Sequence, residues 1–162
     1  MIMNKIIPFL ALVLFTISSC STPKNMSEFY DKYDKQSTVI PLPKFAINLA
    51  KKNTDLKILE YINSAKVFII TDAGKAKQNR VIKNLIAATK GENYEQMIKL
   101  KVKKNNVNAA YLEDKGQINQ LILGVNGLRN VLVIDSKVNL TKEQLEEALD
   151  NVDLSELEDI LK

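Results

Sequence analysis

The second half of the chain has the most regular alternation of hydrophobic and polar residues. Between residues 98 and 103, three aliphatic side chains alternate with three lysines. This is the period-two pattern of a strand with one buried and one solvated face. Three more strand-like segments follow, at 107–112, 118–125 and 128–135. The turns between the four segments are expected at Asn105-Asn106, Asp114-Lys115-Gly116 and Asn126-Gly127. The pattern predicts a four-stranded antiparallel meander.

Strand and helix patterns alternate before the meander. The β-branched residues 38–40 predict a short strand that ends at Pro41-Leu42-Pro43. Residues 66–71 include four consecutive apolar residues, as in a central strand that is buried on both faces. Apolar residues at helical spacing predict three helices, around 45–50, 56–62 and 81–89. A glycine at position 91 is expected to end the last of them.

Residues 21–35 allow two interpretations. The segment is rich in polar residues and has few aliphatic ones, as a tether has. Three aromatic residues, Phe29, Tyr30 and Tyr33, instead fit one face of a short helix that begins near Ser27, whose hydroxyl would cap it.

Two amphipathic helices are expected at the C-terminal end. Thr141 and Gln144 have the spacing of a capping box. Asp153 and Glu156 repeat that spacing ahead of a second apolar stripe, formed by Leu154, Leu157, Ile160 and Leu161. Together the patterns predict an α+β fold for residues 36–162: a mainly antiparallel sheet of about five or six strands that includes the meander, with helices packed on one face.

The first 20 residues have the pattern of a bacterial lipoprotein signal peptide. Lys5 is followed by an apolar run from Ile6 to Ile17 and then by Ile17-Ser18-Ser19-Cys20. The run is shorter than the roughly 20 residues of a spanning helix. The tetrapeptide resembles a lipobox, which implies cleavage after residue 19 and lipid attachment to Cys20. The alternative is an ordinary secretory signal with an incidental cysteine. We therefore expect a signal peptide at 1–19 and a lipidated tether at 20–35.

The composition argues against common enzyme classes. The chain has no histidine, and Cys20 is its one cysteine. A lipidated Cys20 leaves no thiol for a disulfide, a nucleophile or a metal site, and histidine is the most frequent general base. The sequence also lacks phosphate-binding glycine loops and a nucleophile elbow. We expect a non-enzymatic protein without a metal or cofactor; an enzyme that uses Lys with Asp or Glu is the alternative.

Charge is distributed unevenly along the chain. Residues 21–110 have 17 Lys and Arg against 8 Asp and Glu, a balance of +9, whereas residues 111–162 have 5 against 11, a balance of −6. An exported chain has no ready access to nucleic acid, so we expect an anionic lipid or an acidic protein as the partner. The candidate binding surface is the lysine stripe Lys99, Lys101 and Lys103, whose side chains stand about 7 Å apart on one strand face. The alternative is an ordinary solvated surface.

Several short clusters resemble one family across the chain. They are Phe29-Tyr30-Asp31-Lys32-Tyr33, Tyr94-Glu95-Gln96-Met97, Leu121-Ile122-Leu123-Gly124 and Val152-Asp153-Leu154. In these clusters and in the order of its elements, the chain resembles a family of small lipoproteins of Bacteroidetes-type bacteria known as domain of unknown function 4252. The resemblance supports the envelope location and the fold, and it brings no activity and no catalytic residues.

The expected function is that of a lipid-anchored envelope protein whose domain binds another macromolecule or the membrane surface. Residues 21–25, which follow Cys20, contain no acidic residue. They therefore lack an inner-membrane retention signal and an acidic surface-export signal, and we expect an outer-membrane protein that faces the periplasm. A sensory or regulatory lipoprotein that acts with a signalling partner is a further alternative.

Overall fold

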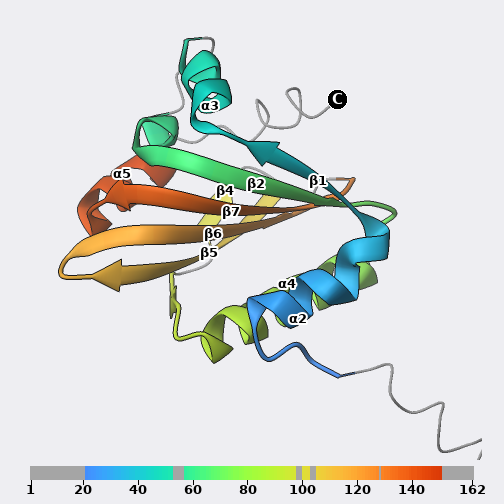
Figure 1. Ribbon diagram of the computed structural model, residues 1–162. Helices are drawn as coiled ribbons and strands as arrows, with labels where there is room; N and C mark the ends of the chain where they lie inside the picture. Colours follow the sequence, from blue (N-terminus) through green and yellow to red (C-terminus); the bar gives the residue numbers. More distant parts are fainter. Residues whose placement is uncertain (1–20, 53–56, 98–99, 103–104, 128, 151–162) are drawn as a thin grey trace, which may run out of the picture.

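The computed structural model describes residues 21–52, 57–97, 100–102, 105–127 and 129–150 (Figure 1). Its four described α-helices are α2 (Met26–Tyr33), α3 (Lys44–Lys51), α4 (Lys75–Gly91) and α5 (Lys142–Asp150). Two 3-10 helices are η2 (Asp34–Gln36) and η3 (Lys57–Tyr61). The strands are β1 (Ser37–Leu42), β2 (Ile62–Ile70), β3 (Glu95–Gln96), β4 (Leu100–Val102), β5 (Asn105–Asp114), β6 (Gln117–Asn126) and β7 (Val131–Leu140).

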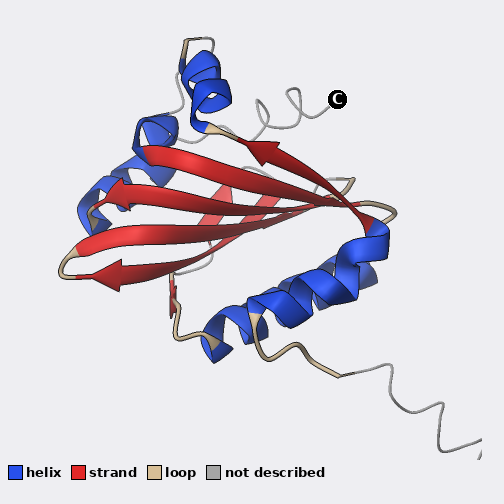
Figure 2. Ribbon diagram, in the orientation of Figure 1, coloured by secondary structure: helices blue, strands red, loops and turns tan. Residues whose placement is uncertain are grey.

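All seven described strands belong to one antiparallel sheet (Figure 2). The order across the sheet is β1-β2-β7-β6-β5-β3, and β4 also pairs with β5. The short strands β3 and β4 lie one after the other along the same edge of β5, so the sheet is six positions wide. The predicted α+β class, the antiparallel sheet and the meander β4–β7 are confirmed.

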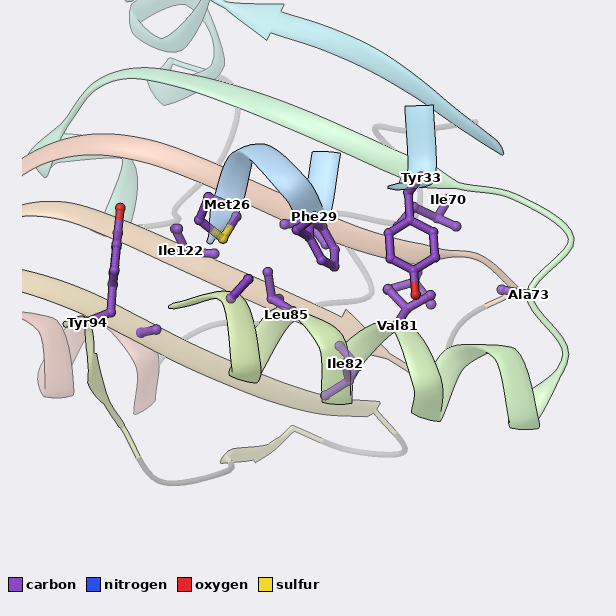
Figure 3. Close-up of a cluster of buried hydrophobic side chains, with 14 residues drawn as sticks. Met26, Phe29, Tyr33, Ile70, Ala73, Val81, Ile82, Leu85, Tyr94 and Ile122 are labelled. Atoms are coloured by element: carbon purple, nitrogen blue, oxygen red, sulfur yellow. The ribbon is translucent and has the colours of Figure 1, made fainter. Parts of the chain in front are cut away.

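Helices cover both faces of this sheet. Ile122 of β6 belongs to a core cluster with α2 and α4 (Figure 3). Its neighbours Leu121 and Leu123 belong to a second cluster with α3, η3 and α5. Successive side chains of a strand point to opposite faces, so the two clusters lie on opposite sides of the sheet. The prediction of helices on one face holds for α2 and α4, which lie together in Figure 1. The second helical layer, formed by α3, η3 and α5 on the other face, was not predicted.

The aromatic residues near the N-terminus are part of the folded domain. Phe29 and Tyr33 of α2 are buried together with Met26. The helix is capped by Asn25, whose Oδ1 accepts a hydrogen bond of 2.8 Å from the backbone N–H of Glu28, and not by Ser27 as predicted. The helical interpretation of this segment is therefore the one that the structure has, and a tether that extends to residue 35 is wrong. Met26, Phe29 and Tyr33 recur at helical spacing, so a helix places all three on one face, against the core.

Several element boundaries differ from the predicted ones. Asn105 and Asn106 are strand residues of β5, so the β4–β5 connection lies at 103–104, outside the described residues. Strand β7 begins at Val131, because Gly127, with φ +105°, opens a longer loop after β6. At the other end of the sheet, β1 continues through Pro41, since an edge strand tolerates a residue that lacks an N–H.

The helices that frame the sheet follow their sequence signals closely. Helix α4 ends at Gly91 as predicted. The capping box at the start of α5 is confirmed by two hydrogen bonds: the Thr141 N–H donates to Gln144 Oε1 at 2.8 Å, and the Gln144 N–H donates to Thr141 Oγ1 at 3.3 Å. The expected helix at 56–62 is reduced to η3, and Ile62 already belongs to β2. The helix expected after Asp153 lies outside the described residues.

Candidate functional site

The candidate site is built around the carboxylate of Asp135 on strand β7. Its Oδ2 accepts a hydrogen bond of 2.7 Å from the Tyr30 hydroxyl of α2. Its Oδ1 accepts a bond of 3.2 Å from the Gln120 side-chain amide of β6. One half-buried carboxylate thus joins a helix to two strands, and both of its oxygens are held in place.

Tyr30 is fixed in its role as a hydrogen-bond donor. Its ring stacks on Phe68 of β2, with a centroid distance of 4.2 Å and an interplanar angle of 9°. Burial, and then the neighbouring charge of Asp135, raise the pKa of the Tyr30 hydroxyl far above its ordinary value of 10.0. The phenol therefore stays protonated and donates to Asp135. Burial raises the pKa of nearby Tyr94 as well, with Asp135 as the second cause.

Two lysines flank Asp135 on the same face of the sheet. Lys66 of β2 is the direct cross-strand partner of Asp135, and paired residues project to the same face about 5 Å apart. Lys137 lies two residues further along β7, on the same face about 7 Å away. Lys137 in turn is paired with Ser64 on one side and with Gln120 on the other. The register thus brings three strands together at one polar patch.

This patch forms the floor and wall of a pocket of about 370 Å³. Its lining consists of Pro41, Leu42, Pro43, Ser64, Ala65, Lys66, Gln120, Asp135 and Lys137. The volume is within the range of ordinary small-ligand sites. A second pocket, of about 150 Å³, lies between η3 and α5 beside the exposed ion pair of Lys57 with Glu147, and it is below that range.

The two cationic groups that line the larger pocket outnumber its one carboxylate, Asp135. Lys66 and Lys137 are both exposed, and neither forms an ion pair among the described residues. The one carboxylate between them is already bonded to Tyr30 and Gln120. The site therefore offers two free ammonium groups to a ligand. Within the described ranges, no cluster of acidic residues has the arrangement of a metal site.

The family described as domain of unknown function (DUF4252) matches residues 29–148, which is most of the chain. The chain belongs to this family. The match begins within α2, at Phe29, and ends two residues before the end of α5, so the DUF4252 domain includes Tyr30 as well as every strand that lines the pocket. No curated protein and no solved structure matches the chain.

The residues predicted as sites fall largely outside the described part of this DUF4252 domain. Cys20, Lys99 and Lys103 lie outside the described residues. Lys101 is on β4, opposite Asn106 at the far edge of the sheet from β1. Lys101 and the pocket therefore lie at different parts of the sheet. None of the described helices is long and apolar enough to span a membrane.

The pocket residues were missed because they come from strands that are far apart in the sequence. Lys66 was expected at the start of a strand and Asp135 at the end of another. The local pattern gives little help, because Ser136 between Asp135 and Lys137, and Asn63 before Ser64, are polar as well and do not mark one face. Only the register of β2 against β7 shows that Lys66 shares one face with Asp135 and Lys137.

Proposed function

We propose that this chain is a lipid-anchored, non-enzymatic binding domain of the bacterial cell envelope, and that its pocket receives an acidic group of a protein partner. The observation that carries the proposal is the pair Lys66 and Lys137. Both lysines flank a carboxylate that is already hydrogen-bonded, and neither has an ion-pair partner among the described residues. A carboxylate of a ligand would form charge-assisted hydrogen bonds with them.

The shape of the site favours a protein partner over a membrane surface. The lysines line a concave pocket that is bordered by Pro41 and Pro43. An acidic side chain of a peptide can enter such a pocket, whereas the headgroups of a flat bilayer meet the most protruding groups first. Anionic lipid is therefore the weaker candidate.

The chemistry of the site supports binding more than catalysis. Tyr30 has a raised pKa and keeps its proton, so it is unsuited to act as a base at neutral pH. Lys66 and Lys137 are exposed, whereas a catalytic lysine is usually desolvated. The absence of histidine from the sequence points in the same direction.

The proposed location rests on the first 25 residues. We infer that Cys20 carries the lipid, that two or more acyl chains make the anchor stable, and that the domain faces the periplasm from the outer membrane. In cells given labelled palmitate, the parent chain should take up label and Cys20→Ala should remain an unlabelled precursor. Labelling of the Cys20→Ala chain would contradict lipid attachment at this residue.

Binding of a hexaglutamate peptide tests the proposed site. Exposed ion pairs contribute up to about 1 kcal/mol each, so Lys66→Gln/Lys137→Gln should weaken binding about tenfold at low salt. The parent's affinity should fall as salt shortens the screening length. The control Lys75→Gln/Lys83→Gln removes the same charge from the exposed face of α4 and should bind as the parent does.

Two results would refute this assignment. An equal loss in both double variants would mean that the peptide responds only to net charge. Unchanged binding in the pocket variant, with loss in Lys99→Gln/Lys101→Gln/Lys103→Gln, would transfer the function to the lysine stripe. Vesicles of phosphatidylglycerol, tested in parallel, should depend less on Lys66 and Lys137 than the peptide does.

A further inference from the structure

Helix α3 turns two large apolar side chains toward solvent. Phe45 is 76% exposed and Leu49 is 62% exposed, whereas Ile47 of the same helix is buried. Phe45 and Leu49 are one helical turn apart and are neighbours on the helix surface. They are the most exposed large apolar residues of the described chain. We call this pair the α3 patch.

The surroundings of the α3 patch are basic. Lys44 precedes Phe45, and Lys51 and Lys52 follow Leu49. Residues 44–52 contain no carboxylate. Lys52 is seven positions from Phe45 and three from Leu49, so it is on the same side of the helix as the patch. Two exposed apolar side chains surrounded by lysines suit an occupant that is both apolar and acidic.

The last twelve residues of the chain have this complementary character. Residues 151–162 contain four carboxylates and one lysine, a net charge of −3. Their apolar residues recur at helical spacing: Val152, Leu154, Leu157, Ile160 and Leu161. A helix of this kind cannot bury its apolar stripe without a partner surface.

Helix α5, which the segment follows in sequence, shares a neighbour with α3. Helix α5 ends at Asp150, and both α5 and α3 contact η3. An ion pair of 3.1 Å between Lys57 and Glu147 ties η3 to the last turns of α5. Figure 1 shows α3 and α5 at the same end of the sheet. Twelve residues span about 18 Å as a helix, and the eight residues of α3 span about 12 Å.

We propose that residues 151–162 dock on the α3 patch. Leu157 and Ile160 cover Phe45 and Leu49, and the carboxylates of the segment face Lys44 and Lys52. Because the segment is covalently attached, its effective concentration is high and weak contacts suffice. A protein that binds α3 must first displace this acidic segment. The proposal does not depend on the function of the pocket, since it involves a different surface.

A single-tryptophan chain tests the docking directly. The sequence contains no tryptophan, so Phe45→Trp in the full-length chain provides one indole at the patch. With the segment docked, its emission should be blue-shifted and acrylamide should quench it several-fold less than free N-acetyltryptophanamide. Adding Leu157→Asp/Ile160→Asp, or Lys44→Glu/Lys52→Glu, should restore solvent-like emission and quenching. The control Lys75→Glu/Lys83→Glu reverses two charges on α4 and should leave the indole shielded. Circular dichroism confirms that each variant is folded.

Three results would overturn the proposal. The indole of the Phe45→Trp chain could be as accessible as the free compound. Its shielding could depend on protein concentration and survive Leu157→Asp/Ile160→Asp, which would make a second copy the occupant. The shielding could also be lost in Lys66→Gln/Lys137→Gln and kept in Lys44→Glu/Lys52→Glu, which would place the segment at the pocket.

Discussion

Replacing Phe29 with alanine tests whether helix α2 is a structural part of the domain. The Phe29 side chain is 1% exposed. Its ring lies 5.8 Å from the ring of Tyr30 and 5.0 Å from that of Tyr33, measured between centroids. Removing a buried phenylalanine side chain costs about 3–5 kcal/mol, because burial is lost and a cavity remains. Helix α2 is near the N-terminal end of the domain and can relax, so we expect about 3 kcal/mol.

This free energy corresponds to a large shift in the midpoint of thermal unfolding. The unfolding entropy is about 2.1 cal/mol/K per residue, or about 0.25 kcal/mol/K for a domain of about 120 residues. A loss of 3 kcal/mol should therefore lower the midpoint by about 12 °C. The measurement is thermal unfolding followed by circular dichroism at 222 nm on the chain from residue 21 onward.

A matched substitution separates this effect from the general loss of a phenylalanine. Phe45→Ala makes the same chemical change at a side chain that is 76% exposed. It should cost at most about 1 kcal/mol, or about 4 °C, since it removes no core contact and only weakens the docking of residues 151–162 proposed above. If Phe29→Ala lowers the midpoint no more than Phe45→Ala does, α2 is not packed into the domain. The segment would then be a tether, as one interpretation of the sequence had it.

Substitutions at three further contacts test other parts of the fold. Burial raises the pKa of the Tyr30 hydroxyl above 10.0, so the contribution of this hydroxyl to stability is complete below pH 10 and is lost as the pH rises above that value. In urea unfolding at a series of pH values, the parent should lose stability above pH 10 more steeply than Tyr30→Phe. An equal dependence of stability on pH in the two chains would contradict the buried hydroxyl. A Cβ at Gly91 would collide with the carbonyl oxygen of Lys24, whereas one at Gly74 meets nothing within 4 Å. Gly91→Ala should therefore lower the thermal midpoint more than Gly74→Ala, whose cost is limited to a less favourable N-cap of α4. Equal midpoints would mean that residue 24 is not held against α4. Thr141→Ala removes a capping-box acceptor and should cost about 1 kcal/mol by urea unfolding; no loss would show that the box is not formed in solution.

Local patterns in the sequence predicted most of the architecture. The strand-like segment 118–125, followed by Asn126-Gly127, located β6, and helical spacing with Gly91 located α4 and its end. Strand boundaries were less well predicted because tertiary pairing sets them. Asparagine, at positions 105 and 106, is typical of turns, yet pairing with β4 and β6 keeps both residues in β5.

Long-range register explains why the candidate site could not be read from the sequence. Lys66 and Asp135 are 69 positions apart and meet only because β7 inserts between β2 and β6. Tyr30 reaches Asp135 from a segment whose sequence also allowed a tether. The lysine stripe was predicted as a binding surface because its charges recur at every second position of one short segment. Lys66 and Lys137 lie on different strands and come to one face only through the sheet register, so they give no such local signal.

The most direct test of the central claim is the location of the bound peptide on the domain. In two-dimensional NMR spectra of the labelled chain from residue 21 onward, hexaglutamate should shift the backbone amides of residues 64–66, 120 and 135–137, which surround the pocket. The amides around Lys75 and Lys83 on α4 serve as the internal reference and should move little. Shifts that gather at residues 99–103, with the pocket amides unchanged, would contradict the claim that Lys66 and Lys137 form the binding site.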